Sequence, residues 1–185
     1  ARRVALEADL ISRSTWERLA AAAPEVELVP VSGWVEELRA TKDPTELERI
    51  SAACAVADRA LATILPEIRP GATEREVALR LEWEIRTGGA ESLAFDVICL
   101  SGPEAALPHG IPGDRPIVPG AVLLIDFGAR VEGYRSDMTR TLFVGEPSPR
   151  DLAAYELVHR AQSTALDWIA ARVSAGEPLP DGKAL

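Results

Sequence analysis

The stretch Val122–Val144, VLLIDFGARVEGYRSDMTRTLFV, decides the fold that we expect for this chain. It begins with a run of four apolar residues, and a second strand-like run follows a reversal that contains Gly133. Two runs rich in β-branched and apolar residues on either side of a short turn are typical of an antiparallel hairpin. We therefore predict strands over 122–128 and 134–144.

Each predicted strand carries one aspartate, Asp126 and Asp137. If the chain reverses over Arg130–Gly133, both aspartates are equally far from the middle of the turn, so they lie directly opposite one another. Opposed side chains share a face of the sheet with Cβ atoms about 4.5–5.5 Å apart, and the pair would point into one pocket. A one-residue shift in this pairing would place the two side chains on opposite faces.

Two carboxylates in this arrangement need a proton, a cation or hydrogen-bond donors to offset their negative charge. Like charges held so close repel, and an unpaired charge next to an apolar strand costs several kcal/mol when it is buried. A shared proton or one or two divalent cations would relieve the repulsion, and oxygen ligands suit Mn, Mg, Co or Zn. The alternative is that both aspartates accept hydrogen bonds from the backbone or from Arg135 and Arg140.

Cap signals upstream and downstream of the hairpin predict three helices. Asp43-Pro44-Thr45-Glu46 is an N-terminal cap for a helix that ends before Pro66, and Thr73-x-x-Glu76 begins a second helix that ends at Gly88-Gly89. Ser148-Pro149 begins a third helix that runs to about Val173. We also predict a strand over 95–99 and a Gly/Pro-rich loop over 101–120, which together give a mixed α+β fold with antiparallel pairing.

The first 41 residues are too short to form a domain alone. They contain a strand-like stretch over 3–8, a possible capping box at Ser14-x-x-Glu17 for a short helix, and a second strand near 25–30. We interpret residues 1–41 as the C-terminal remnant of a preceding domain and its linker.

Charge and composition exclude several classes of partner. The 185 residues contain 20 Lys and Arg against 29 Asp and Glu, a net charge of −9, which disfavours binding to nucleic acid or to an anionic membrane. No apolar run approaches the ~20 residues that cross a bilayer, so we expect a cytoplasmic protein. Cys54 and Cys99 form no C-x-x-C pair, and we expect both thiols to be reduced and buried.

The segment Pro108–Pro147 resembles the metal-binding hairpin of the creatinase and aminopeptidase P family, the pita-bread metallopeptidases. The resemblance rests on Pro108-His109-Gly110, Asp126-Phe127-Gly128 and Ser136-Asp137-Met138-Thr139-Arg140-Thr141, together with Gly133-Tyr134. Lys42-x-x-x-Glu46-x-x-x-Ile50 is similar to the entry into the catalytic domain of that family. The resemblance implies that 42–185 is the first half of a pita-bread domain with an antiparallel sheet and flanking helices, and that the chain is incomplete at both ends.

The resemblance also implies roles for three residues. Asp126 would bind one metal ion, Asp137 would bridge two ions (Mn, Co or Zn), and His109 would lie near the substrate and assist proton transfer or stabilise the intermediate. Thr139 and Thr141 are weaker candidates for hydrogen bonds that support the ligands. His159, within the last helix, is expected at the surface or at an interface.

The function implied is that of an Xaa-Pro dipeptidase or aminopeptidase, a metallopeptidase that hydrolyses the bond before proline in dipeptides or short peptides and is often a homodimer. The family uses two Asp, one His and two Glu as ligands, and this chain contains the two Asp, so by itself it is expected to be inactive. Two alternatives share the fold: a metal-free creatinase-like hydrolase and a non-catalytic module that binds peptides or proteins.

Overall fold

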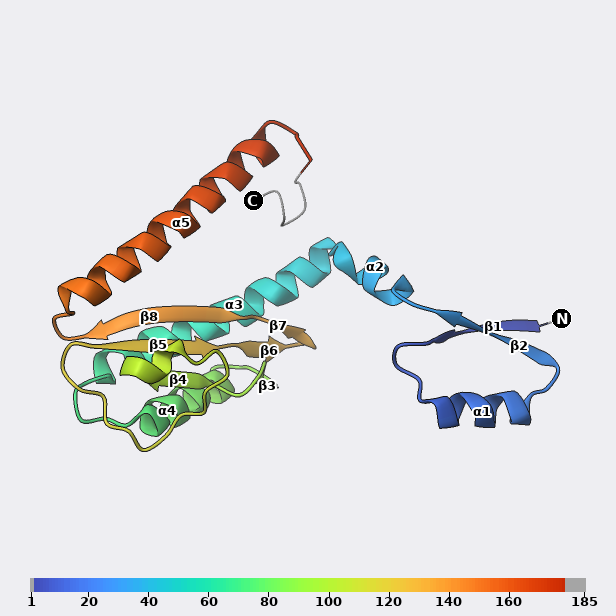
Figure 1. Ribbon diagram of the computed structural model, residues 1–185, viewed down its shortest axis with the longest axis horizontal. Coiled ribbons are helices and arrows are strands. Elements are labelled where there is room, and N and C mark those ends of the chain that lie inside the picture. Colours follow the sequence, from blue (N-terminus) through green and yellow to red (C-terminus); the bar gives the residue numbers. More distant parts are fainter. Residues whose placement is uncertain (1, 179–185) are drawn as a thin grey trace. The chain divides into compact units, whose positions relative to one another are not determined.

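The computed structural model describes residues 2–178, and the chain divides into two compact units, Ala1–Leu47 and Glu48–Leu185 (Figure 1). In the first unit, strands β1 (Arg2–Glu7) and β2 (Val26–Val31) pair in parallel. A parallel pair needs a crossover connection, and helix α1 (Arg13–Ala22) lies in it. A short helix that the sequence did not predict, α2 (Trp34–Ala40), follows β2.

The predicted cap of α1 is wrong by two residues. Ser12, not Ser14, is the N-cap, and its side chain accepts a hydrogen bond from the backbone N of Thr15 at 3.2 Å. Two serines stand close together in this stretch, and Ser14 lies already inside the helix, where its side chain cannot serve as the cap.

The three other predicted helices are confirmed. Helix α3 (Pro44–Ile64) begins with a reciprocal cap, since Glu46 N donates to Asp43 Oδ1 at 2.9 Å and Asp43 N donates to Glu46 Oε2 at 2.8 Å. Helix α4 (Glu74–Thr87) begins with a complete capping box at Thr73, and the side chain of Ser148 caps helix α5 (Pro149–Ser174). A short 3-10 turn, Leu65–Glu67, follows α3.

Two three-stranded antiparallel sheets form the rest of the second unit. One has the order β4-β5-β8, with β4 at Ile98–Ser101, β5 at Ala121–Phe127 and β8 at Met138–Val144. The other has the order β3-β6-β7, with β3 at Ser92–Leu93, β6 at Ala129–Val131 and β7 at Tyr134–Arg135. The strand predicted at 95–99 therefore begins three residues later, where Ile98 pairs with Asp126.

The hydrophobic core lies on one face of the β4-β5-β8 sheet. Alternate residues of β5 are fully buried, and they belong to one apolar cluster with side chains of α3 and α4, such as Ile64, Leu81 and Ile85. The cluster members from β5 are Leu123, Ile125 and Phe127. Because side chains alternate along a strand, Asp126 points to the face opposite this core.

The pairing register of the hairpin differs from our prediction. The turn has two residues, Glu132 and Gly133, with φ of 46° and 83°, and Val131 pairs with Tyr134 across it. Asp126 therefore lies opposite Thr139 rather than Asp137. The register is displaced by two residues, a full repeat of side-chain alternation, so the two aspartates keep the same face as diagonal neighbours.

The two cysteines differ in environment, which corrects the expectation that both are buried. Cys54 is exposed, whereas Cys99 is fully buried in β4. Burial, with a smaller effect from the negative charge of Glu74, raises the pKa of the Cys99 thiol to about 12.

We predict that iodoacetamide at pH 8 modifies Cys54 and leaves Cys99 unmodified in the folded protein. The thiolate is the reactive form, and a thiol with a pKa near 12 is almost wholly protonated at pH 8 and lacks access to the reagent. Mass spectrometry of peptides labelled with and without denaturant measures this difference. Equal rates of modification at the two sites in the native protein would contradict it.

Candidate metal centre

The three residues singled out from the sequence line one cavity of about 520 Å³. His109 comes from the loop after β4, Asp126 from β5, and Asp137 from the segment between β7 and β8. The remaining wall is formed by Phe95, Asp96, Val97, Ile98, Gly110, Ile111 and Pro112. Asp96 was missed because the sequence offers no local signal that β4 pairs beside Asp126, which is what brings residues 95–98 to this cavity.

Asp126 is half-buried and held by its partner across the sheet. Thr139 Oγ1 donates a hydrogen bond to Asp126 Oδ1 at 2.9 Å, as the register places these residues directly opposite. The bond engages Oδ1, and within residues 2–178 no hydrogen bond or ion pair engages Oδ2. The prediction of a supporting hydrogen bond is thus confirmed for Thr139, whereas within residues 2–178 Thr141 forms no side-chain hydrogen bond.

The segment that carries Asp137 is anchored by the preceding residue. Ser136 is buried; its Oγ accepts from Ala129 N at 3.0 Å and donates to the carbonyl oxygen of Ala53 in α3 at 3.2 Å. Asp137 itself is exposed, and its carboxylate has no hydrogen bond or ion pair within the described part of the chain. Burial therefore raises the cost of the negative charge of Asp126 in part and that of Asp137 not at all.

The arginine alternative finds no support in the geometry. Arg140 Nη1 donates to the carbonyl oxygen of Thr139 at 2.9 Å, and among residues 2–178 neither Arg135 nor Arg140 forms an ion pair with Asp126 or Asp137. The two carboxylates thus face one cavity without a cation from the described chain to balance them.

His109 and His159 lie in different surroundings. His109 is exposed, and the neighbouring Gly110 packs tightly on the buried Leu100, since a Cβ at Gly110 would lie 2.5 Å from Leu100 Cδ1. His159 is an exposed residue of α5 that stacks on Tyr155, with ring planes 7° apart. His109 therefore belongs to the cavity of the two aspartates, and His159 lies at the surface.

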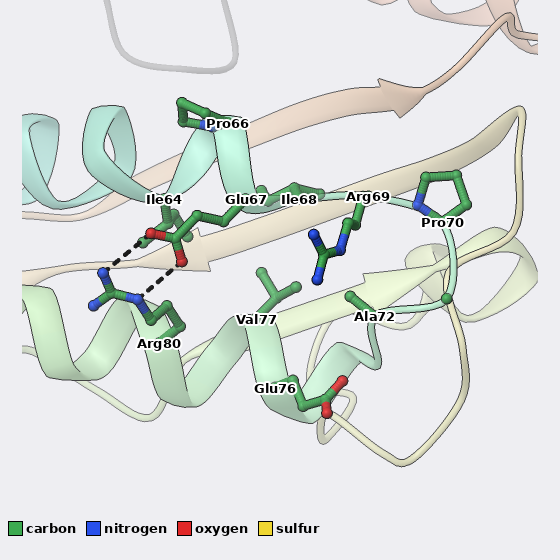
Figure 2. Close-up of a pocket in the computed structure, with 11 residues that line it drawn as sticks. Ile64, Pro66, Glu67, Ile68, Arg69, Pro70, Ala72, Glu76, Val77 and Arg80 are labelled. Atoms are coloured by element: carbon green, nitrogen blue, oxygen red, sulfur yellow. Dashed lines mark hydrogen bonds and ion pairs between the residues drawn. The ribbon is translucent and has the colours of Figure 1, made fainter.

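A second cavity, of about 610 Å³, offers a contrast (Figure 2). It is lined by the end of α3, the segment 66–72 and the residues Glu76, Val77 and Arg80 of α4. Glu67, one of its two carboxylates, accepts two hydrogen bonds from Arg80, at 2.9 and 3.1 Å. Arg80 also contacts Glu84 of the same helix. The two carboxylates of this cavity are both engaged, since Glu67 is paired with Arg80 and Glu76 accepts from Thr73 in the capping box, whereas Asp137 has no such partner in residues 2–178.

The donor set of the first cavity suits a divalent cation but is incomplete. Two carboxylates supply hard oxygen ligands of the kind that Mn²⁺, Co²⁺ and Zn²⁺ accept. Within residues 2–178, no group of three His, Cys, Asp or Glu side chains comes close enough to hold a metal ion. Asp126 and Asp137 are therefore candidate ligands, and they are fewer than a metal site needs.

Two family models match the chain. The model of metallopeptidase family M24 matches residues 48–178, and the model of the creatinase/prolidase N-terminal domain matches residues 1–41. The chain belongs to metallopeptidase family M24. Membership confirms the resemblance to the creatinase and aminopeptidase P group and implies a divalent metal cofactor.

Relatives of known name support the same assignment. The chain is 42% identical to an Xaa-Pro dipeptidase of Pyrococcus furiosus over 133 residues, which are 72% of this chain and 38% of that enzyme. It superposes on the structure of an Xaa-Pro dipeptidase from Bacillus anthracis with a TM-score of 0.83 and 40% identity, covering 87% of this chain and 45% of that one. For an X-Pro aminopeptidase from Thermotoga maritima the TM-score is 0.84 at 38% identity, covering 90% of this chain and 47% of the other.

These matches confirm the predicted α+β architecture as part of a pita-bread fold. The chain spans less than half the length of the curated relatives it matches, 38% in the case of the Pyrococcus furiosus enzyme. Within residues 2–178, no helix is long and apolar enough to cross a membrane. The predicted domain division between residues 41 and 42 stays a prediction.

Proposed function

We propose that the protein containing this chain is a metal-dependent peptidase that hydrolyses the Xaa-Pro bond of dipeptides or short peptides. One observation carries the proposal: in a chain of family M24, Asp126, Asp137 and His109 line the same cavity. The names of the relatives include both an Xaa-Pro dipeptidase and an X-Pro aminopeptidase, so both short substrate classes belong to the proposal.

Each of the three residues has a role that its surroundings support. Asp126, oriented by Thr139, would bind one metal ion through Oδ2, and Asp137, which has no competing partner in residues 2–178, would bridge two ions. A bound divalent ion lowers the pKa of a coordinated water and stabilises the oxyanion that develops on the substrate carbonyl. The imidazole of His109 would assist proton transfer beside the substrate or stabilise the intermediate.

The remaining features of the proposal follow from the resemblance and the composition. The resemblance implies two ions of Mn, Co or Zn, which would need one His and two Glu in addition to Asp126 and Asp137. We propose a homodimer in the cytoplasm, and we propose that 1–41 and 42–185 belong to different domains. The net charge of −9 supports a peptide substrate rather than nucleic acid.

Metal content tests the proposal directly. After loading with Mn²⁺ or Co²⁺ and removal of unbound ions, the protein that contains this chain is expected to retain about two ions and to hydrolyse an Xaa-Pro dipeptide. Chelation is expected to abolish hydrolysis, and readdition of metal to restore it. A protein that retains no metal would overturn the proposal in favour of the metal-free hydrolase or the binding module, and turnover of a substrate would distinguish those two.

A further inference from the structure

Glu74 is a buried carboxylate with no role in the proposed chemistry. It is the first residue of α4 and is 1% exposed, the only charged residue among the fully buried side chains of residues 2–178. Burial of a carboxylate is costly unless donors surround it, and the start of a helix is a favourable place for a negative charge. The donors that surround Glu74 therefore show which parts of the chain this carboxylate holds together.

Those donors come from two places in the chain. Glu74 Oε1 accepts from the backbone N of Ser101 at 2.8 Å and from its Oγ at 3.0 Å, and Glu74 Oε2 accepts from the backbone N of Gly113 at 3.2 Å. Arg115 Nη1 adds a longer contact to Oε1 at 3.4 Å. Ser101 is the last residue of β4, and Gly113 lies where the chain returns toward β5, so one carboxylate binds both ends of the intervening loop.

Further bonds strengthen this closure. The backbone N of Glu74 donates to the carbonyl oxygen of Arg115 at 3.1 Å, and Arg75 N donates to the carbonyl oxygen of Gly113 at 3.0 Å. Arg115 Nη1 also pairs with Glu104 Oε2 inside the loop at 2.7 Å. The returning end is thus attached to the first turn of α4 by several bonds, whereas the outgoing end at Ser101 is tied to α4 by the Glu74 side chain.

The loop between these ends, residues 102–112, contains His109 and most of one wall of the metal cavity. Its first part, Gly102–Ala106, is a short 3-10 helix that lies against β4 and β5, and further along Gly110 approaches Leu100 closely. His109 belongs to the exposed stretch that follows the 3-10 helix. Without the Glu74 carboxylate, Ser101 stays paired with Leu123 of β5 and the carbonyl oxygen of Gly113 stays bonded to Arg75 N. What is lost is the group that joins the two ends to each other, and we expect this loss to let His109 move relative to Asp126 and Asp137.

We propose that Glu74 is a positioning residue for His109: by binding both ends of loop 102–112 it holds the imidazole at the wall of the cavity that contains Asp126 and Asp137. The anchoring of the loop stands on the hydrogen bonds alone. Its effect on catalysis rests on the proposed function, because His109 acts on a substrate in that case only.

Two substitutions of Glu74 separate its bonds to Ser101 from its bond to Gly113. Glu74→Ala removes every side-chain bond to the loop. Glu74→Gln keeps one side-chain oxygen, which can still accept from Ser101. Its amide NH₂ then faces the N–H of Gly113, and because both groups are donors the bond to Gly113 is lost, at nearly constant side-chain volume. We expect a large effect for alanine and an intermediate effect for glutamine, which is therefore a partial rescue.

Glu76→Gln is the matched control. Glu76, labelled in Figure 2, lies two residues further along the same helix turn. Its carboxylate accepts from Thr73 N at 2.8 Å and Thr73 Oγ1 at 3.1 Å, within the capping box rather than in the loop. The substitution weakens the start of α4 without cutting the bonds to Ser101 or Gly113. It reports what a general weakening of this helix does to the site.

The direct measurement is the imidazole signal of His109 in nuclear magnetic resonance spectra, assigned by its disappearance in a His109→Gln variant, with His159 as internal reference. The Glu74 variants are expected to shift or broaden the His109 signal and to leave His159 and the Glu76→Gln spectrum unchanged. In kinetics with an Xaa-Pro dipeptide, Glu74→Ala is expected to lower kcat about a hundredfold with KM and metal content little changed, as for a misplaced catalytic group.

An unchanged His109 signal in a folded Glu74 variant would overturn the inference, and so would an equal perturbation by Glu76→Gln. If Glu74→Ala fails to fold, the same comparison is made with Glu74→Gln, for which an unchanged His109 signal is equally decisive. If the unmodified protein does not cleave Xaa-Pro dipeptides, the proposed function fails, whereas the spectra still decide whether Glu74 positions His109.

Discussion

Gly128→Ala is expected to destabilise the protein more than any other single methyl group added to the hairpin. An ideal Cβ at Gly128 would lie 2.0 Å from the backbone oxygen of Ser136 and 2.9 Å from Cβ of Ala94. The first neighbour is backbone and cannot rotate away. Relief requires β6 and the 136–138 segment to separate, which breaks the hydrogen bond from Ser136 N to the carbonyl oxygen of Ala129 (2.9 Å) and exposes the buried Ser136.

The expected cost combines overpacking with the loss of buried hydrogen bonds and is about 3–5 kcal/mol. Gly133→Ala in the turn of the same hairpin is the matched control: nothing lies within 4 Å of its Cβ, and its φ of 83° costs about 1–2 kcal/mol for an L residue. Urea unfolding followed by circular dichroism measures both variants. Equal destabilisation would show that the close approach at Gly128 does not constrain the hairpin.

The hairpin also shows what the sequence could and could not predict. The strand over 122–128 and the common face of the two aspartates follow from the apolar pattern of 122–144 and agree with the structure. The single strand predicted over 134–144 is wrong, because the chain leaves the ladder at Ser136 and Asp137 and forms β7 and β8 in two different sheets. The register was wrong because two-residue hairpin turns are usually recognised by Asn-Gly or Asp-Gly, whereas here Glu132 adopts the left-handed conformation, uncommon for a residue with a Cβ. The prediction that both aspartates share a face was still correct, because the register error was two residues and side chains alternate with a period of two.

Long-range contacts account for what the sequence could not predict around the cavity. The capping boxes at Asp43 and Thr73 are local and were predicted correctly, since each involves residues three positions apart. The bonds of Glu74 to Ser101 and Gly113 join residues that are 27 and 39 positions apart, and no periodic pattern in the sequence predicts them. In the same way, Asp96 lies at the cavity because β4 pairs with β5, and this pairing cannot be predicted from the sequence because a long loop separates the two strands.

Asp137→Asn is expected to abolish metal-dependent hydrolysis while leaving the fold intact. The side chain is exposed and has no hydrogen bond or ion pair within residues 2–178, so the amide removes no interaction of the folded chain. It does remove the negative charge and the second oxygen that a bridging ligand needs. Loss of an outer-shell partner costs about 10–100-fold in metal affinity, and loss of the ligand itself is expected to exceed about a hundredfold.

Asp96→Asn is the matched control, because Asp96 is an exposed carboxylate on the wall of the same cavity. It removes the same charge from the cavity, so general electrostatic attraction for the cation falls equally in both variants, whereas direct ligation is lost at Asp137 alone. Calorimetric titration with Mn²⁺ and hydrolysis of an Xaa-Pro dipeptide, with thermal unfolding as the check on folding, separate the two effects. Unchanged activity in Asp137→Asn would remove Asp137 from the site, and equal losses in both variants would reduce its role to that of one negative charge among several around the cavity.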